Sequence, residues 1–250
     1  ASIERDFQNS FPTLYKGNNM QVDQTNKFDL SENIRALFGW NFQYLEDQTA
    51  ENNHQFTIFD PYLSVIYDLA SGFNLHLGAR LNTHSDYDNS MLYTINPSWS
   101  IDLNQGWIVK PFASFSNSYN TPSLYQINNE LYGNASLSPE KTDNYELGIS
   151  VYVREKFTLN AALFQRIEDS AIDFRSLFNP DGSFAGGEYF NLVDSREVQG
   201  LELDGSYSLG QIQVEGHYSK LATNNDESFA RIPKLKYGMS VAYAHPSDLH

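Results

Sequence analysis

The feature that most constrains the fold of this sequence is an alternation of apolar and polar residues, sustained over long segments. In FNLHLGARL, residues 73–81, every second residue is apolar, and the same period recurs at 144–153, 156–163, 201–209 and 211–219. Successive side chains of a strand point to opposite faces of a sheet, so this period predicts strands with one apolar and one polar face. No segment sustains a helical period, and the chain is therefore predicted to be all-β.

We expect about twelve antiparallel strands, and several of them are longer than the usual length of about five or six residues. Their expected bounds are 2–8, 19–24, 28–46, 54–69, 72–84, 90–102, 106–118, 142–153, 156–168, 188–208, 211–222 and 234–245. The connections alternate between short turns, at 68–73, 103–107, 153–157 and 209–211, and long polar loops, at 47–54, 84–90, 117–142, 168–188 and 221–234. Short turns at one end and long loops at the other are typical of an outer-membrane β-barrel.

The composition excludes several other classes of protein. Hydrophobic residues make up 40% of the 250 residues, and no run approaches the roughly 20 apolar residues of a membrane-spanning helix. The net charge of −15, from 16 Lys+Arg and 31 Asp+Glu, argues against a nucleic-acid partner. Because the chain has no cysteine, it has neither a disulfide framework nor a thiolate metal site.

Alternation alone also fits a soluble β-sandwich or propeller. Charged residues on the polar face of strand interiors favour the membrane barrel, because they suit a wide, water-filled lumen. These residues are Arg80, Glu146, Glu202, Asp204 and Glu215. Aromatic residues near strand ends would form two belts at the interfaces of the lipid bilayer, although aromatics are common in any strand. One belt would hold Tyr67, Phe73, Trp107, Phe157, Tyr207 and Tyr243, and the other Tyr44, Phe59, Tyr93, Tyr119 and Tyr145.

A more specific pattern begins at Pro111 and reads PFASFSNSYNTPSLYQINNELYGNASLSPEKTDNYELGISVYV. Two prolines within it lack the N–H that a strand ladder needs, and Gly133-Asn134 is a turn signal. The segment resembles the TonB-dependent outer-membrane receptors. The matching residues are Tyr119, Pro122, Ser123, Leu124, Tyr125, Gly133, Asn134, Leu137, Pro139, Glu140, Lys141, Asn144, Tyr145, Glu146, Leu147 and Gly148. The motif could be a ligand-binding loop or a clamp that only holds the loop in place.

The resemblance covers essentially all 250 residues and implies an antiparallel transmembrane β-barrel in the outer membrane of a Gram-negative bacterium. Residues 1–250 would be the middle part of a barrel of about 22 strands. The N-terminal plug domain, its TonB box and the last strands of such receptors are not found in this sequence, so we expect a partial domain that does not function alone. Within the family, segment 78–101 most resembles the vitamin B12 (cobalamin) receptors of the Bacteroidetes type.

The resemblance implies active uptake of a scarce nutrient, with cobalamin as the expected ligand. TonB would drive this uptake by acting on the plug domain, and a surface lipoprotein could be a further partner. A siderophore or haem receptor and a passive porin-type barrel are the alternatives. Aromatic faces and amides of the long loops would select a large polar ligand. The candidate residues are Tyr125, Gln126, Asn128, Asn129, Tyr132, Tyr87 and Arg175.

Enzymatic function is not expected. Ser123 lacks the Gly-x-Ser-x-Gly context of a nucleophile, and the six histidines never approach His-x-x-x-His spacing. No cofactor is expected either. A calcium ion in the extracellular loops could use Asp86 and Asp88, since this ion prefers oxygen ligands. Solvated carboxylates at a loop rim are the commoner explanation for such a pair.

Overall fold

The computed structural model describes residues 2–7, 13–48, 54–154, 156–224 and 232–244. Within these ranges the chain forms strands almost throughout, with one short helix, α1, at Leu124–Asn128. The strands are β1 Ser2–Phe7, β2 Thr13–Ser31, β3 Ile34–Asp47, β4 His54–Asp68, β5 Phe73–His84, β6 Ser90–Trp99, β7 Ile101–Asp102, β8 Trp107–Asn120, β9 Glu140–Val153, β10 Phe157–Asp169, β11 Ile172–Phe178, β12 Phe184–Asn191, β13 Arg196–Leu209, β14 Ile212–Thr223 and β15 Leu235–Tyr243. Parts of two expected long loops, 49–53 and 225–231, lie outside the described residues.

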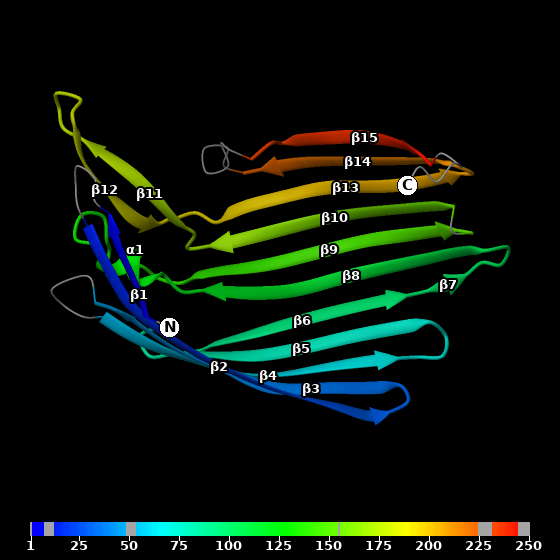
Figure 1. The fold of residues 1–250 in the computed structure, drawn as a ribbon, viewed down its shortest axis with the longest axis horizontal. Coiled ribbons are helices and arrows are strands. Elements are labelled where there is room, and N and C mark those ends of the chain that lie inside the picture. The colour runs from blue at the N-terminus through cyan, green and yellow to red at the C-terminus, as the bar shows by residue number, and fades with distance from the viewer. Residues whose placement is uncertain (1, 8–12, 49–53, 155, 225–231, 245–250) are drawn as a thin grey trace, which may run out of the picture.

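Apart from β11 and β12, the strands form one antiparallel sheet, in which most strands pair with the next strand of the chain and β10 pairs with β13 (Figure 1). Its order is β1-β2-β3-β4-β5-β6-β8-β9-β10-β13-β14-β15, with β7 paired to β8 at one end. The remaining strands, β11 and β12, form a separate hairpin that projects from the long-loop end. The prediction of an all-β antiparallel barrel wall is confirmed.

Four expected strands have clearly different bounds in the structure. The strand expected at 19–24 lies within β2, which runs without a break from Thr13 to Ser31. The strand expected at 28–46 is broken at Glu32 and Asn33, where β2 turns into β3. This turn is polar, and the Ser31 hydroxyl accepts a hydrogen bond from the Asn33 N–H at 3.3 Å, as serine often does in turns. The strand expected at 188–208 stops at Asn191 and resumes at Arg196, and the one expected at 90–102 is interrupted at Ser100. The expected loop 168–188 is largely the hairpin β11–β12.

The pairing register places the alternating residues of neighbouring strands on common faces. Leu163 lies opposite Leu147 on one side and Leu201 on the other, so the apolar set is continuous across β9, β10 and β13. The side chains of this face are open to the surroundings, and Leu147 is 62% exposed. On the opposite face, Asn160 lies between Ser150 and Asp204. An exposed apolar face and a polar interior are what lipid on one side and water on the other require.

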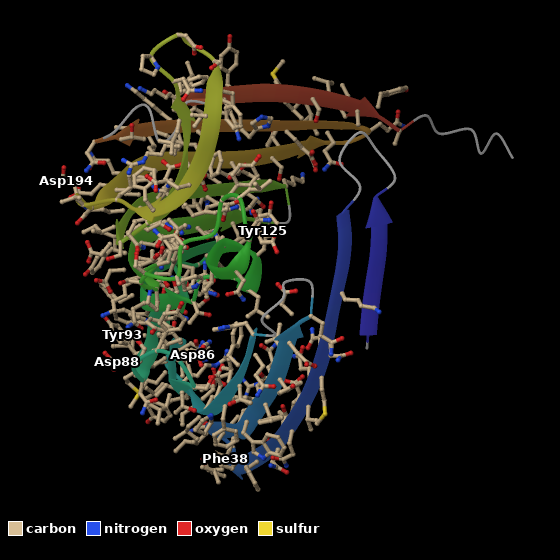
Figure 2. The ribbon with its side chains drawn as sticks, turned by 90° about the vertical axis from the view of Figure 1, so that its left-hand side faces the viewer. Phe38, Asp86, Asp88, Tyr93, Tyr125 and Asp194 are labelled. Carbon is tan, nitrogen blue, oxygen red and sulfur yellow. The ribbon has the colours of Figure 1, made fainter. Side chains whose placement is uncertain are left out.

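Figure 2, which looks from the long-loop end, shows the sheet curling around an interior in which α1 lies. The described residues contain no large apolar core inside this curve. The buried apolar residues are few, and they are Phe56, Ile127, Leu137 and Ala171. All four belong to the long-loop end, where connections pack on the rim. Among the described residues, no helix is long and apolar enough to cross a membrane.

Candidate functional site

The helix α1 forms inside the long connection between β8 and β9 because its ends are capped. Pro122, before it, is fully buried. The Ser123 hydroxyl accepts a hydrogen bond from the Gln126 N–H at 3.2 Å, and the Gln126 side chain accepts one from the Ser123 N–H at 2.8 Å. This reciprocal pair is a capping box, which begins a helix at Leu124. At the other end, the Asn129 side chain accepts hydrogen bonds from the N–H groups of the next turn.

This connection crosses the interior of the sheet. The helix contacts β3 and β4, which are several strands away from β8 and β9 in the sheet order. A tight return follows the helix at Gly133, whose N–H donates to the Asn129 carbonyl at 2.7 Å. A Cβ atom at Gly133 would lie 2.5 Å from that same oxygen, so only glycine fits here. The loop at 121–139 therefore covers part of the lumen at the long-loop end.

Side-chain amides join this loop to the hairpin β11–β12. The Asn134 amide donates to the Tyr189 carbonyl at 2.8 Å. The Asn191 amide donates to the carbonyls of Ser138 at 2.9 Å and Ser170 at 2.6 Å, and its oxygen accepts from the Ser138 N–H at 2.8 Å. Two segments far apart in the sequence are thus held together by hydrogen bonds to the backbone. We call the contacts of Asn134 and Asn191 the loop clamp.

Glu140, the first residue of β9, ties β9 to two further elements. One carboxylate oxygen accepts from the Asn120 amide at 2.7 Å, at the end of β8. The other accepts from the Ile172 N–H at 2.6 Å, at the start of β11. Glu140 and Asn134 are both motif residues, and the polar groups of both hold the loops. These contacts favour the interpretation of the motif as a clamp that holds the loop in place. Two further motif residues, Pro139 and Lys141, line a cavity at the rim, which we call the rim cavity.

Aromatic rings pack where the loop and the hairpin meet. Tyr125 contacts Tyr189 at 6.3 Å between ring centroids, Phe174 contacts Tyr189 at 5.1 Å, and Tyr132 contacts Phe174 at 5.7 Å, all edge to face. Tyr125 is 39% exposed and lies on α1 inside the curve of the sheet (Figure 2). The structure therefore brings together two of the predicted ligand residues, and the signal that predicted them was their place in the longest loop.

The other predicted ligand residues have different surroundings. Arg175 forms an ion pair with Glu188 across the hairpin and stacks over the Phe190 ring at 4.9 Å. Asn128, on α1, has a buried amide nitrogen without a hydrogen-bond partner among the described residues. The side chains of Gln126 and Asn129 cap the helix. Contact of these four residues with a ligand remains a prediction.

Tyr87 lies in a separate connection, between β5 and β6. Its ring is 4.9 Å from that of His84, and burial, with the nearby Asp86 carboxylate, raises its pKa. Asp86 itself pairs with His54 at 3.1 Å, and Asp88 lines the same rim cavity of 580 Å³. Among the described residues, no group of three or more His, Cys, Asp and Glu could hold a metal ion. A calcium site at this pair of aspartates stays a prediction.

Two motif residues on β9 face opposite ways. Tyr145 belongs to the outward row, where it contacts Phe115 at 6.2 Å and is 40% exposed. Glu146 faces the interior and lines a cavity of 700 Å³. The same cavity is lined by a buried carboxylate, Glu168, which pairs with Arg196 at 2.5 Å and Arg166 at 3.2 Å. The inner wall thus carries charged residues, as predicted for a polar lumen, and some of them are paired.

A second inner-wall cavity, of 510 Å³, was not predicted from the sequence. It is formed mainly by β2 to β5, whereas the first is formed mainly by β8 to β10 and β13, and it is rich in amide and carboxylate groups. Its lining residues are Gln21, Asp23, Asn41, Gln43, Ile58, Asp60, Tyr62, Arg80, Asn82, Tyr119, Asn120 and Thr121. Polar residues at every second position of β2 to β5 were the only sequence signal for it.

This geometry defines the wall of an outer-membrane β-barrel whose interior is partly covered by its own extracellular loops. The model of the family "TonB dependent receptor-like, beta-barrel" matches residues 3–249. The chain therefore belongs to the TonB-dependent receptor β-barrel family, and it lies in the outer membrane of a Gram-negative bacterium.

Solved structures agree with this fold. The siderophore receptor PirA from Pseudomonas aeruginosa has a TM-score of 0.72 and 20% identity, over 92% of this chain and 45% of that one. The ferric enterobactin receptor PfeA from the same organism has a TM-score of 0.71 and 16% identity, over 95% and 40%. The copper transporter OprC has a TM-score of 0.70 and 14% identity, over 94% and 42%. The chain spans less than half of each of these proteins. No curated protein sequence matches it.

Proposed function

We propose that the whole protein imports vitamin B12 (cobalamin) across the outer membrane, with energy supplied through TonB. The observation that carries this proposal is the amide-rich cavity below the loops. Five of its lining residues are neutral amides, namely Gln21, Asn41, Gln43, Asn82 and Asn120. Four of these amides already donate to carboxylates, which leaves oxygens such as those of Gln21 and Asn41 to accept hydrogen bonds. Cobalamin is a large ligand with many peripheral amide groups that can donate to such oxygens.

A ferric siderophore or haem is the alternative cargo. It is supported by the similarity of fold to proteins described as siderophore receptors. The charge balance of the chain, −15, counts against an anionic ferric siderophore. A passive porin is less well supported, because the loop at 121–139 reaches across the interior to β3 and β4.

Energy coupling requires parts of the protein beyond residues 1–250. We propose that these residues are a partial barrel domain and that a plug domain elsewhere in the protein binds TonB. The coverage of less than half of the similar structures supports this division. A surface lipoprotein is a proposed further partner, supported by the exposed Phe178 and Phe184 near the tip of the projecting hairpin. No catalytic function is proposed.

The cargo is tested by equilibrium binding to the full-length protein in detergent, with cyanocobalamin and ferric enterobactin as the two probes. The proposal predicts micromolar or tighter binding of cyanocobalamin and much weaker binding of ferric enterobactin. The reverse order of affinities would contradict the choice of cobalamin while leaving the family assignment intact.

A further inference from the structure

The cavity of 700 Å³ on the inner wall of β8 to β10 and β13 begins at the long-loop end. Its residues nearest to that end are Glu168, one residue before the end of β10, and Arg196, the first residue of β13. On β8, Ser116 lines this cavity, and Asn120, four residues further along, lines the amide-rich cavity. These two residues are about 13 Å apart along the strand, at a rise of roughly 3.3 Å per residue. A large ligand in the lumen can therefore contact both cavities.

The charges at this end of the cavity leave one positive charge unbalanced. The buried Glu168 carboxylate pairs with Arg196 at 2.5 Å and with Arg166 at 3.2 Å, so two guanidinium groups share one carboxylate. The Arg196 side chain is only 19% exposed, whereas the Arg166 side chain is 52% exposed. A guanidinium has five N–H donors. Within the described part of the chain, the Arg166 side chain donates through Nη2 to Glu168 and to no other group. Its remaining donors are accessible to a molecule in the cavity.

The other charged residues of the cavity lie further from the long-loop end. The pairing register places Glu146 one inward position below Arg166, and Glu202 two inward positions below it. Lys236 stands at the level of Glu202. Among the described residues, Glu168 is the only carboxylate within ion-pair distance of the Arg166 guanidinium. The entrance of the cavity is therefore cationic, and its remaining carboxylates lie deeper, where they can accept hydrogen bonds from N–H groups of a ligand.

We infer that the Arg166 guanidinium binds a phosphate-ester group of the cargo at the entrance of this cavity. A guanidinium presents its donors as a planar fork that matches the oxygens of a phosphate. The inference rests on the proposed function and deepens it, because cobalamin carries one phosphodiester, in the side arm that ends in its nucleotide base. Cyanocobalamin is neutral overall, because this group balances the charge of the corrin-bound cobalt. The acidic balance of the chain therefore does not repel it.

The test compares two probes, cyanocobalamin and dicyanocobinamide, by equilibrium binding to the full-length protein in detergent. Dicyanocobinamide retains the corrin ring and its amides but lacks the phosphodiester and the nucleotide base. The variant Arg166→Gln loses the charge and the fork, while Arg196 still pairs with Glu168. We expect cyanocobalamin to bind this variant about tenfold more weakly than the wild type, and dicyanocobinamide to bind both equally.

The matched control is Arg154→Gln, which removes the same charge in the turn between β9 and β10, at the opposite end of the wall. The Arg154 side chain donates to the Gln105 carbonyl at 2.7 Å and lies outside the cavity. Both probes should bind this variant as they bind the wild type. The heat-dependent shift in gel mobility of a folded barrel checks that each variant folds.

Two results would overturn Arg166 as a phosphodiester site. The first is a folded Arg166→Gln variant with wild-type affinity for cyanocobalamin. The second is an equal loss for both probes, because Arg166 would then act on the corrin ring or through another part of the protein, such as a plug domain. Both results leave the proposed cobalamin uptake intact. Failure of the wild-type protein to bind cyanocobalamin would instead contradict the proposed function, and the phosphodiester site with it.

Discussion

At the scale of single residues, a few side chains decide how the loops are held. Asn191 ends β12, yet its amide makes three hydrogen bonds to the backbone of Ser138 and Ser170. A side-chain amide can imitate a strand neighbour in this way, because it carries a donor and an acceptor side by side. The extracellular loops are therefore fixed by specific contacts, although they contain little apolar core.

Replacing Asn191 by alanine should loosen the clamp. With the three hydrogen bonds lost, we expect amide hydrogen exchange at Ser138 to be faster by about tenfold or more. Exchange followed by mass spectrometry on the full-length protein measures this. The matched control is Asn179→Ala, because within the described part of the chain the Asn179 side chain bonds only to Ser183, in the turn of the same hairpin. Equal exchange in the two variants would show that the amide does not hold the loop.

Gly148, on the inner face of β9, is a second residue whose identity is fixed by packing. A Cβ atom there would collide with the Phe112 ring and lie 2.8 Å from the Ala161 carbonyl oxygen. We expect Gly148→Ala to reduce the free energy of unfolding by about 1–3 kcal/mol. Urea unfolding in lipid vesicles measures it. The control, Gly216→Ala, meets nothing closer than 3.8 Å and should change stability by less than about 0.5 kcal/mol. Similar losses in both variants would contradict the packing argument.

At the scale of elements, the alternation of apolar and polar residues predicts the strands. The positions at which strands end depend on local turn residues, which the alternation does not reveal. The turn at Glu32 and Asn33 was missed because the polar stretch before it has few apolar residues to mark a face. The hairpin β11–β12 was predicted as a loop because its two strands are shorter than their neighbours, and because Gly186-Gly187 and the turn at Pro180-Asp181-Gly182 interrupt the alternation. The capping box of Ser123 and Gln126 is a sequence signal that could have predicted α1.

The two faces of a strand should respond differently to the same substitution. Leu147 faces outward in the middle of β9, so Leu147→Arg would place a charge in lipid and cost about 2–4 kcal/mol of stability. Asn160→Arg introduces the same side chain on the inner face, where a cavity of 460 Å³ and Asp204 can accommodate it. Folding into vesicles, followed by tryptophan fluorescence, compares the two. A larger loss at the inner position would contradict the assignment of the faces.

At the scale of the whole molecule, the distribution of polarity is the reverse of that of a soluble protein. The apolar side chains of the sheet are exposed on its outer face, while carboxylates such as Asp60 and Glu168 are buried on the inner face. The sequence was sufficient to predict this arrangement, because it follows from period and strand length. It could not predict the inner cavities, because their residues come from several strands and from the loop after β8, and only the pairing register of β4 and β5 brings Asp60 close to Asn82.

The proposed cobalamin uptake is measured with radiolabelled cyanocobalamin in intact cells that express the full-length protein. We expect accumulation against a gradient that requires both TonB and the proton-motive force, because we propose an energised receptor and not an open pore. Uptake that proceeds equally in cells without TonB and only equilibrates the vitamin, or no uptake at all, would contradict it.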